Sequence, residues 1–574
     1  MAFSVVPYSI DNLIQCLVRG SAKAPVDRIS RKLHRTYFEE YFQALSAKTI
    51  VVETGYIDRD YLEDYAAYYD RCFENYDRKT LRLHFFDIEV DEDFFGAAVT
   101  RGRDCSEEVQ LRAGYLGFVV IKPLPLAVIG RTCLRTYPDD GGRRNFPCLR
   151  TYPVNLFGME LSVESLAYQE QDTVVAACAT SALWSCLQGT GKLFQHPIPP
   201  PVEITNWAGE HMPENFAAAS SRAFPNDGLT AGQMAYAVRR VGLEPLVIGA
   251  GTRYELNGLA YAFLKCRIPS VLVYALHEVS NKGKLVEVGQ HAVAITGFSL
   301  SEDAPVLPRR GTGFQLRAAK IDKLYGHDDQ VGPFARMAWP TSDEADSLAG
   351  LLSTSDEPAP STGKHLSDEV FLKTSRAGEV YAQINFVLLP LYHKIRIPYS
   401  LIHDVALRLD SLVEKVRSNV PTVSRGEWDI YLTTSNDFKA SIRNDYPKWG
   451  IDPADTLYTP LPRFMWRMLL RVGGQVELDF LFDATGIAQH DLVVHHISRG
   501  GYQDILKLIA GVSRAHGSDP SCQVAAVLEA ISADEPQPMD GSLSERLVWE
   551  QAFREMKRAT EQPAANDENG SQTG

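Results

Sequence analysis

Residues 171–187 read QDTVVAACATSALWSCL, and this stretch decides the fold of the middle of the chain. After Cys178, small and apolar residues recur at helical spacing, at positions 179, 182, 183, 186 and 187. The pattern predicts a buried helix whose first turn contains Cys178. A helix N-terminus carries partial positive charge and free backbone N–H groups, which stabilise a thiolate. Cys178 is therefore a candidate nucleophile, although a single cysteine in an apolar helix is more often a core residue.

A second motif places a histidine beside an apolar strand. Residues 289–298 read GQHAVAITGF, and His291 opens the run of small and apolar residues that predicts the strand. A histidine at a strand start, next to a glycine, can project into a cleft and serve as the general base for a thiol. The simpler interpretation is a half-buried structural histidine. Between the two motifs, residues 228–243 predict a helix with Thr230 as its N-cap and Gly242 as the residue that stops it.

Two adjacent carboxylates follow the next predicted strand. Residues 323–334 read KLYGHDDQVGPF, in which the strand leads into a tight turn at Asp328 and Asp329. Either carboxylate can hold the second ring nitrogen of a histidine and fix its tautomer, which is the third role in a catalytic triad. A solvated turn favours the same residue types, and the neighbouring His327 is a secondary candidate for the base.

The order of these motifs resembles that of papain-like cysteine peptidases, and of the C39-like peptidases in particular, over roughly residues 165–340. The C39-like peptidases include domains that process bacteriocin leaders. The resemblance implies a papain-like domain in which Cys178 is the nucleophile and His291 the general base. It assigns Asp328 as the orienting acid, because Gly332 stands four residues later, as in the Asp-Pro-x-x-Gly turn of the family.

The glutamine of the family and several other positions differ here. Gln171 matches the glutamine that supplies an oxyanion donor, with Gln169 as the alternative. Gln171 stands seven residues before Cys178, where the usual offset is six, so the extra residue must bulge. Asp329 replaces the proline of the family, and residues 299–318 form an insertion between the histidine and the acid.

The same three side chains serve several reactions, which differ in the group that accepts the acyl product. We expect a thiol hydrolase, most simply a cysteine peptidase with a protein or peptide substrate. Transglutaminase, deamidase and acyltransferase chemistry on the same fold are the alternatives. A catalytically inactive papain-like scaffold that binds a protein partner is a further one.

Composition narrows the class of protein. The 574 residues include 72 acidic and 58 basic side chains, a net charge of −14 that speaks against a nucleic-acid partner. We expect neither a secretory signal, because no basic region precedes a long apolar core near residue 1, nor a membrane helix, because no apolar run is long enough. The nine cysteines are scattered, without a CxxC pair, which is typical of free thiols in a reducing compartment. We expect a cytoplasmic protein with no membrane partner, no cofactor and no metal.

Changes in composition predict an α+β protein, in which the papain-like domain is flanked by an α-rich N-terminal region and an α+β C-terminal domain. A repeat of CLRTYP at 133–138 and 148–153, separated by DDGG, predicts a β-hairpin between the copies. The predicted regions are an α-rich region at 1–110, a β-hairpin segment joining the catalytic domain at 111–160, the catalytic domain at 161–340, a linker at 341–368, an accessory domain at 369–515 and an acidic, partly disordered tail at 516–574.

Overall fold

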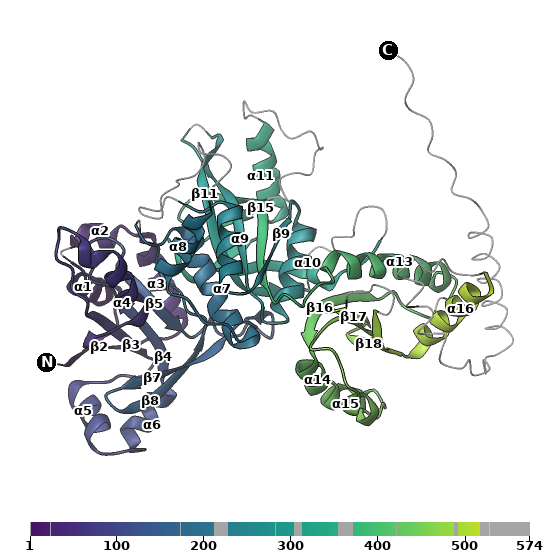
Figure 1. Ribbon diagram of the computed structural model, residues 1–574, viewed down its shortest axis with the longest axis horizontal. Helices are drawn as coiled ribbons and strands as arrows, with labels where there is room; N and C mark the ends of the chain where they lie inside the picture. Colours follow the sequence, from purple (N-terminus) through teal and green to yellow (C-terminus); the bar gives the residue numbers. More distant parts are fainter. Residues whose placement is uncertain are drawn as a thin grey trace, which may run out of the picture. The chain divides into compact units, whose positions relative to one another are not determined.

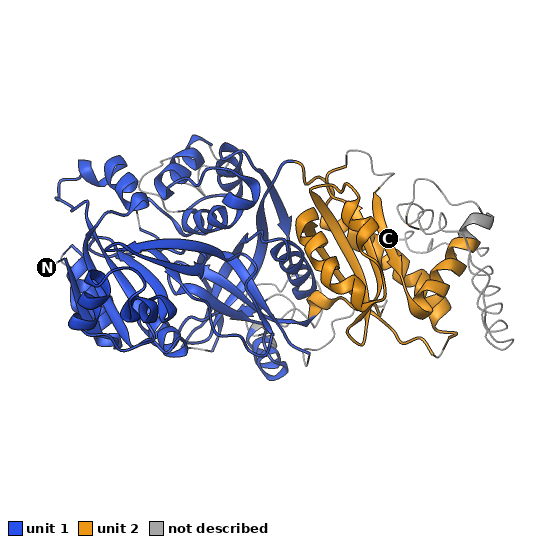
Figure 2. Cartoon of the chain, turned by 90° about the horizontal axis from the view of Figure 1, so that it is seen from below, with its two compact units in different colours: residues 1–304, 320–393 blue, residues 305–319, 394–574 orange. Residues whose placement is uncertain are grey.

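The computed structural model describes residues 2–516 and residue 527, except for 23, 173, 212–227, 282, 303–312, 354–370, 421 and 487–491. The chain divides into two compact units (Figure 2). Unit 1 comprises residues 1–304 and 320–393, and unit 2 comprises residues 305–319 and 394–574. Both units combine helices with antiparallel sheets, which confirms the predicted α+β class. None of the helices in the described ranges is long and apolar enough to cross a membrane.

The N-terminal part of unit 1 is built on a five-stranded antiparallel sheet in the order β1-β2-β3-β4-β5. Its strands are β1 (Phe3–Pro7), β2 (Thr49–Tyr56), β3 (Thr80–Phe86), β4 (Tyr115–Ile121) and β5 (Ile129–Leu134). The accompanying helices are α1 (Ile10–Gly20), α2 (Val26–Ser30), α3 (Leu33–Ala44), α4 (Arg59–Ala67), α5 (Glu92–Thr100), α6 (Ser106–Ala113) and the 3-10 helix η1 (Tyr69–Arg71). The α-rich prediction for 1–110 omitted β1, β2 and β3, which are rich in β-branched and aromatic residues.

The two copies of the CLRTYP repeat do not pair with each other, so the predicted hairpin is wrong. Cys133 of the first copy lies in β5, which pairs with the fully buried β4. The second copy enters β7 (Arg150–Leu156), which pairs with β8 (Met159–Ser165) around a tight turn at Phe157 and Gly158. Burial explains the difference, because β5 is buried along most of its length whereas β7 and β8 both alternate between buried and more exposed residues.

An eight-stranded antiparallel sheet forms the centre of unit 1 (Figure 1). Seven strands follow the order β10-β11-β12-β13-β14-β15-β9, and the eighth, β6, pairs with β11. Strand β10 also pairs with β15, so the pairings close a ring. The strands are β6 (Arg144–Asn145), β9 (Glu244–Gly249), β10 (Ser270–Val279), β11 (Leu285–Leu300), β12 (Ile321–Asp328), β13 (Gly332–Ala338), β14 (Phe371–Lys373) and β15 (Val380–Leu391). The helices of this part are α7 (Cys178–Phe194), α8 (Pro201–Glu210), α9 (Ala231–Arg240) and α10 (Arg253–Leu264). Helix α7 packs mainly on β11.

Strands β14 and β15 carry unit 1 past the predicted domain boundary. The prediction of one accessory domain over 369–515 does not match the division at residue 393, because β15 pairs with both β10 and β9. Most positions of β15 are buried, as suits a strand with a partner on each side. The predicted linker at 341–368 begins with helix α11 (Ser342–Ser353), and its part from residue 354 lies outside the described residues.

Unit 2 is built on a four-stranded antiparallel sheet in the order β16-β17-β18-β19. Its strands are β16 (Glu427–Thr434), β17 (Phe464–Val472), β18 (Gln475–Asp483) and β19 (Val493–Ser498). Its helices are α13 (Tyr399–Arg417), α14 (Ser435–Lys448), α15 (Ala454–Tyr458) and α16 (Gly500–His516). The short segment before η2 (Arg317–Lys320) also belongs here, because the N–H of Trp428 donates to Gln315 O and the ring of Phe314 stacks on Trp428. Beyond His516, the predicted tail lies outside the described residues except for residue 527.

Candidate active site

Cys178 is the first residue of helix α7, as the spacing of small residues predicts. Ala177 precedes it in extended backbone, with φ −72° and ψ 171°, and offers no capping side chain. The N–H groups of the first turn therefore lack a side-chain cap, and the partial positive charge of the helix N-terminus falls near the sulfur. This position places backbone N–H donors beside the sulfur, where they can hold an oxyanion.

Most of the other described cysteines sit where ionisation is unfavourable. Burial raises the pKa of the thiol of Cys16 to about 11 and that of Cys133 to about 12. It also raises the pKa values of Cys148 and Cys186. Cys178 is partly exposed, so it combines access with a helix N-terminus.

A tight turn directly before Cys178 is organised by Asp172. Its Oδ1 atom accepts hydrogen bonds from the backbone N–H groups of Val174, Val175 and Ala176. Its Oδ2 atom accepts a hydrogen bond of 2.9 Å from the hydroxyl of Tyr69, which comes from the N-terminal part of the unit. One buried carboxylate thus fixes the backbone that leads into the helix.

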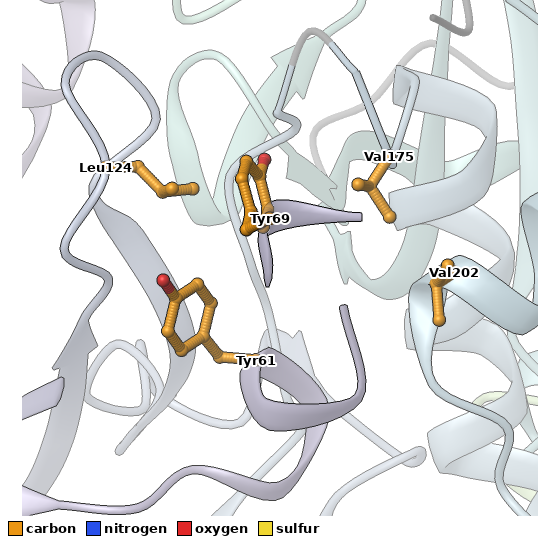
Figure 3. Close-up of a cluster of buried hydrophobic side chains, with 5 residues drawn as sticks. All are labelled: Tyr61, Tyr69, Leu124, Val175 and Val202. Atoms are coloured by element: carbon orange, nitrogen blue, oxygen red, sulfur yellow. The ribbon is translucent and has the colours of Figure 1, made fainter. Parts of the chain in front are cut away.

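The same turn is anchored by an apolar cluster (Figure 3). Val175 packs here with side chains from η1, from helices α4 and α8 and from the loop after β4. The buried members are Tyr61, Tyr69, Leu124, Val175 and Val202. Because Val175 stands three residues before the thiol, this packing limits the positions that Cys178 can occupy.

The two candidate glutamines flank the turn. Gln169 is 4% exposed and Gln171 is half-buried. A backbone bridge between Asp172 and Ala176 closes a small loop between Gln171 and Cys178. This is the stretch in which the seven-residue spacing, one residue longer than in the family, requires an extra residue. The structure therefore leaves both glutamines as candidates for the second oxyanion donor.

His291 lies inside strand β11 and not at its start, so that detail of the prediction is wrong. The strand begins at Leu285, because residues 285–287 already pair with β10 before the register shift that precedes Gly289. His291 is 3% exposed and stands opposite Tyr274 of β10, with the two rings edge to face at 5.6 Å. Its Nε2 atom is 3.0 Å from Oδ1 of Asp328.

The side chain of Cys178 also lies beside the imidazole, close enough to contribute to the raised pKa of His291. Since Asp328 occupies Nε2, Nδ1 is the nitrogen that remains for the thiol. Cysteine, histidine and aspartate, which lie up to 150 positions apart in the sequence, are thus brought into one chain of contacts.

Both carboxylates of the turn after β12 lie beside the imidazole. Asp328 and Asp329 are 5% and 2% exposed, and Oδ1 of Asp329 is 3.5 Å from Nε2 of His291. Oδ1 of Asp328 also accepts a hydrogen bond of 3.0 Å from the N–H of Gln330. Nη2 of Arg376, from the turn between β14 and β15, is 3.6 Å from the same oxygen. Sequence motifs gave no signal for Arg376, because only the strand pairing brings it here.

Electrostatics favour a protonated imidazole in this site. Burial alone would lower the pKa of His291, but the charge of Asp328 and its hydrogen bond, with a further contribution from Asp329 when that group is ionised, outweigh it and hold the pKa well above its usual value. Burial would raise the pKa of Asp328, yet His291 and Arg376 hold it well below its usual value. Burial, together with the charge of Asp328, raises the pKa of Asp329 to about 7, although His291 opposes this shift.

His327 has a structural role. Its Nε2 donates to Leu166 O at 3.0 Å, and its Nδ1 accepts from the N–H of Phe334 at 3.1 Å. Burial lowers its pKa to about 3, so the ring is neutral. With both nitrogens bound to backbone groups, His327 is not available as the base of the site.

The acid turn is braced by the N-terminal part of the unit. The hydroxyl of Tyr168 donates to Asp329 O at 3.1 Å and accepts from Nε2 of His34 in α3 at 2.9 Å. Tyr37 of α3 donates to the backbone oxygen of Pro333. Gly332 has φ +156°, and a Cβ there would lie 2.3 Å from a ring carbon of Tyr37, so the glycine permits this close approach.

One metal-like grouping occurs among the described residues. His291, Asp328 and Asp329 each offer one ligand atom, and these atoms lie within 4.8 Å of one another. However, Nε2 of His291 lies at hydrogen-bonding distance from Asp328, and the positive charge of Arg376 faces the same carboxylate. This arrangement suits the holding of a proton better than the binding of a cation.

Comparisons of the chain with family models, with curated proteins and with solved structures found no match. The chemistry of the site must therefore be inferred from its own geometry.

Proposed function

We propose that the chain is a thiol hydrolase, and specifically a papain-like cysteine peptidase that uses Cys178, His291 and Asp328 as its triad. The observation that carries this proposal is the chain of contacts from the thiol to the imidazole and from Nε2 to Oδ1 of Asp328, 3.0 Å away. The setting supports it as well. The cysteine begins a helix that packs on the antiparallel strand bearing the histidine, and the acid ends the neighbouring strand.

In the first half of the reaction, the Cys178 thiolate attacks the carbonyl carbon of a peptide bond. A C–S bond forms, and the carbonyl π electrons move to the oxygen, which is held by the N–H of Cys178 and, in our proposal, by Gln171 or Gln169. The imidazolium of His291 then donates its proton to the leaving nitrogen as the C–N bond breaks. Asp328 keeps the ring oriented while its charge changes.

In the second half, neutral His291 takes a proton from water, which attacks the thioester carbon. The C–S bond breaks, its electron pair returns to the sulfur and the acid product leaves. The helix N-terminus and the restored imidazolium favour the thiolate again. His291 thus carries the proton in both halves of the reaction.

The test is labelling of the full chain with iodoacetamide near pH 6, followed by peptide mapping. We expect Cys178 to react much faster than the other thiols, and we expect Cys178→Ala to abolish both labelling at this position and cleavage of a peptide mixture. Cys105 provides a matched control, because it is also partly exposed and stands at the N-cap of α6, with no imidazole partner among the residues that the structure describes. Equal labelling of Cys105 and Cys178 would contradict the proposal.

Transfer chemistry shares the first half-reaction with hydrolysis, so the acceptor decides between them. An activated ester that acylates Cys178 can be offered water alone or water with a primary amine. Release of acid only supports the hydrolase, whereas amide formation supports an acyltransferase or transglutaminase. A chain that labels at Cys178 but never turns over any acyl group would be a binding scaffold.

A further inference from the structure

The two carboxylates beside His291 differ in their surroundings. Oδ1 of Asp328 is bound by the imidazole at 3.0 Å and by the N–H of Gln330 at 3.0 Å. Both carboxyl oxygens of Asp329 are buried and lack a hydrogen-bond partner among the described residues. Two adjacent buried carboxylates repel each other when both are ionised, so their pKa values are pushed apart and the one with the higher pKa is the one that holds a proton.

Distance from the imidazole alone gives only a small preference between them. Nε2 of His291 is 3.0 Å from Asp328 and 3.5 Å from Asp329, so both can stabilise a positive ring. A further charge is needed to keep one particular carboxylate ionised beside His291 across the pH range in which the site works.

Arg376 supplies that charge. Its side chain is 11% exposed, and its Nη2 atom lies 3.6 Å from Oδ1 of Asp328. Its Nε and Nη2 atoms are buried and make no hydrogen bond in the described part of the chain. A guanidinium cannot lose its proton in a protein, so at this distance it acts as a fixed positive charge facing Asp328.

We propose that Arg376 is a positioning residue that decides which of the two aspartates serves as the ionised acid of the site. Asp328 stays ionised beside the guanidinium and orients His291, while Asp329 holds the proton. This inference rests on the proposed thiol chemistry, and it answers a question that the sequence left open, namely which of two adjacent aspartates is the third member.

The experiment compares the two aspartates in two backgrounds of the full chain. The measured quantity is the rate constant for alkylation of Cys178 by iodoacetamide, from pH 5 to pH 9, with peptide mapping. In the native background we expect Asp328→Asn to lower the rate at pH 6 at least about tenfold, and Asp329→Asn to lower it much less. With Arg376→Met, we expect the losses from the two asparagine variants to become similar, within about threefold of each other.

Controls separate a charge effect from a loss of structure. Arg376→Lys keeps the charge and should keep most of the native difference between the aspartates. Arg82→Met removes another buried, ion-paired arginine of unit 1, located on β3, and should leave the difference unchanged. Melting curves of each variant report on folding.

Several outcomes would overturn the inference. It fails if Asp329→Asn costs as much as Asp328→Asn in the native background, a result that does not need a folded Arg376→Met chain. It also fails if the difference between the aspartates survives in Arg376→Met, or if Arg376→Lys loses it as fully as Arg376→Met does. If native Cys178 shows no enhanced alkylation at all, the proposed function fails first, and this result is distinguishable from the others.

Discussion

Each unit buries a cluster of charged side chains, and the two clusters differ in how fully their polar atoms are hydrogen-bonded. In unit 2, Arg467 is bound to Asp479 by two hydrogen bonds, of 3.0 Å and 2.6 Å, and its remaining nitrogen donates to Tyr431 and Ser441. In unit 1, His291 has two carboxylates and an arginine around it, and several atoms of that cluster have no hydrogen-bond partner among the described residues.

The comparison teaches how to separate structural from chemical charge. A fully bonded pair fixes a fold, and nothing in it is left to move. Unpaired atoms next to a strongly shifted histidine pKa leave protons free to move between groups, which is what proton-transfer chemistry needs. We therefore expect substitutions in the unit 2 cluster to affect stability alone, and substitutions in the unit 1 cluster to affect reactivity and its dependence on pH.

The largest expected effect is on the free energy of unfolding of unit 2, when the pair of Arg467 and Asp479 is broken. Asp479→Asn leaves the guanidinium of Arg467 buried without its counter-charge, and we expect a loss of about 3–5 kcal/mol in the free energy of unfolding of unit 2. The measurement is urea unfolding followed by intrinsic fluorescence, because Trp428 and Trp466 are buried in this unit. Alkylation of Cys178 in native buffer should not change. A cost below about 1 kcal/mol would show that the bonded pair is not structural.

The next effect depends on pH and concerns Asp329. An unfolded aspartate ionises near pH 4, whereas the folded pKa of Asp329 is about 7. The contribution of this group to stability is therefore intact below pH 4 and is lost as the pH rises towards 7. Asp329→Asn removes this penalty, so we expect stabilisation by at most about 4 kcal/mol at pH 8 and a much smaller gain at pH 5.

Asp328→Asn is the matched control, and its sign is opposite. Its pKa is held below the usual value by His291 and Arg376, so its contribution is present above pH 4 and is lost only on acidification. We expect this variant to be less stable than the native chain at pH 7, in urea or thermal unfolding. Identical pH profiles for the two variants would remove the distinction between the two aspartates.

Local sequence patterns predicted the helix that carries Cys178 and the strand that carries His291, but not the long-range contacts that complete the site. The spacing of small residues identified helix α7 with Cys178 at its start, and an apolar run identified the strand of His291. These signals are local, because they depend on periodicity within one element. The triad itself was proposed by resemblance to a family, not by any local pattern.

Contacts that join distant parts of the chain gave no sequence signal. Asp172 is held by Tyr69, which stands 103 residues earlier, and Arg376 reaches Asp328 only because β14 and β15 join the central sheet. The predicted boundary at 369 separated Arg376 from the site for the same reason. Strand partners depend on pairing across the whole unit, which composition and periodicity do not determine.

A smaller effect tests how the unpaired cluster is held in place. Since the side chain of Asp329 has no hydrogen-bond partner among the described residues, its turn is held through the backbone, by Tyr168 and by Tyr37 of α3. Gly332→Ala places a methyl group against the ring of Tyr37, and we expect a loss of about 1–3 kcal/mol in thermal or urea unfolding. Adding Tyr37→Ala should make the alanine at 332 less costly, because the clashing ring is gone. Additive losses would contradict this contact.

The smallest effect compares two tyrosine hydroxyls, one in each cluster. The hydroxyl of Tyr431 accepts a hydrogen bond of 3.2 Å from Nη1 of Arg467, so Tyr431→Phe should cost about 1–2 kcal/mol. The hydroxyl of Tyr274 is buried beside His291 without a hydrogen-bond partner among the described residues, so Tyr274→Phe removes a polar atom that gains nothing from burial. We expect that variant to be within about 0.5 kcal/mol of the native chain in urea unfolding, or slightly more stable. A larger loss for Tyr274→Phe than for Tyr431→Phe would reverse the comparison, because the active-site cluster would then be the one that holds its unit together.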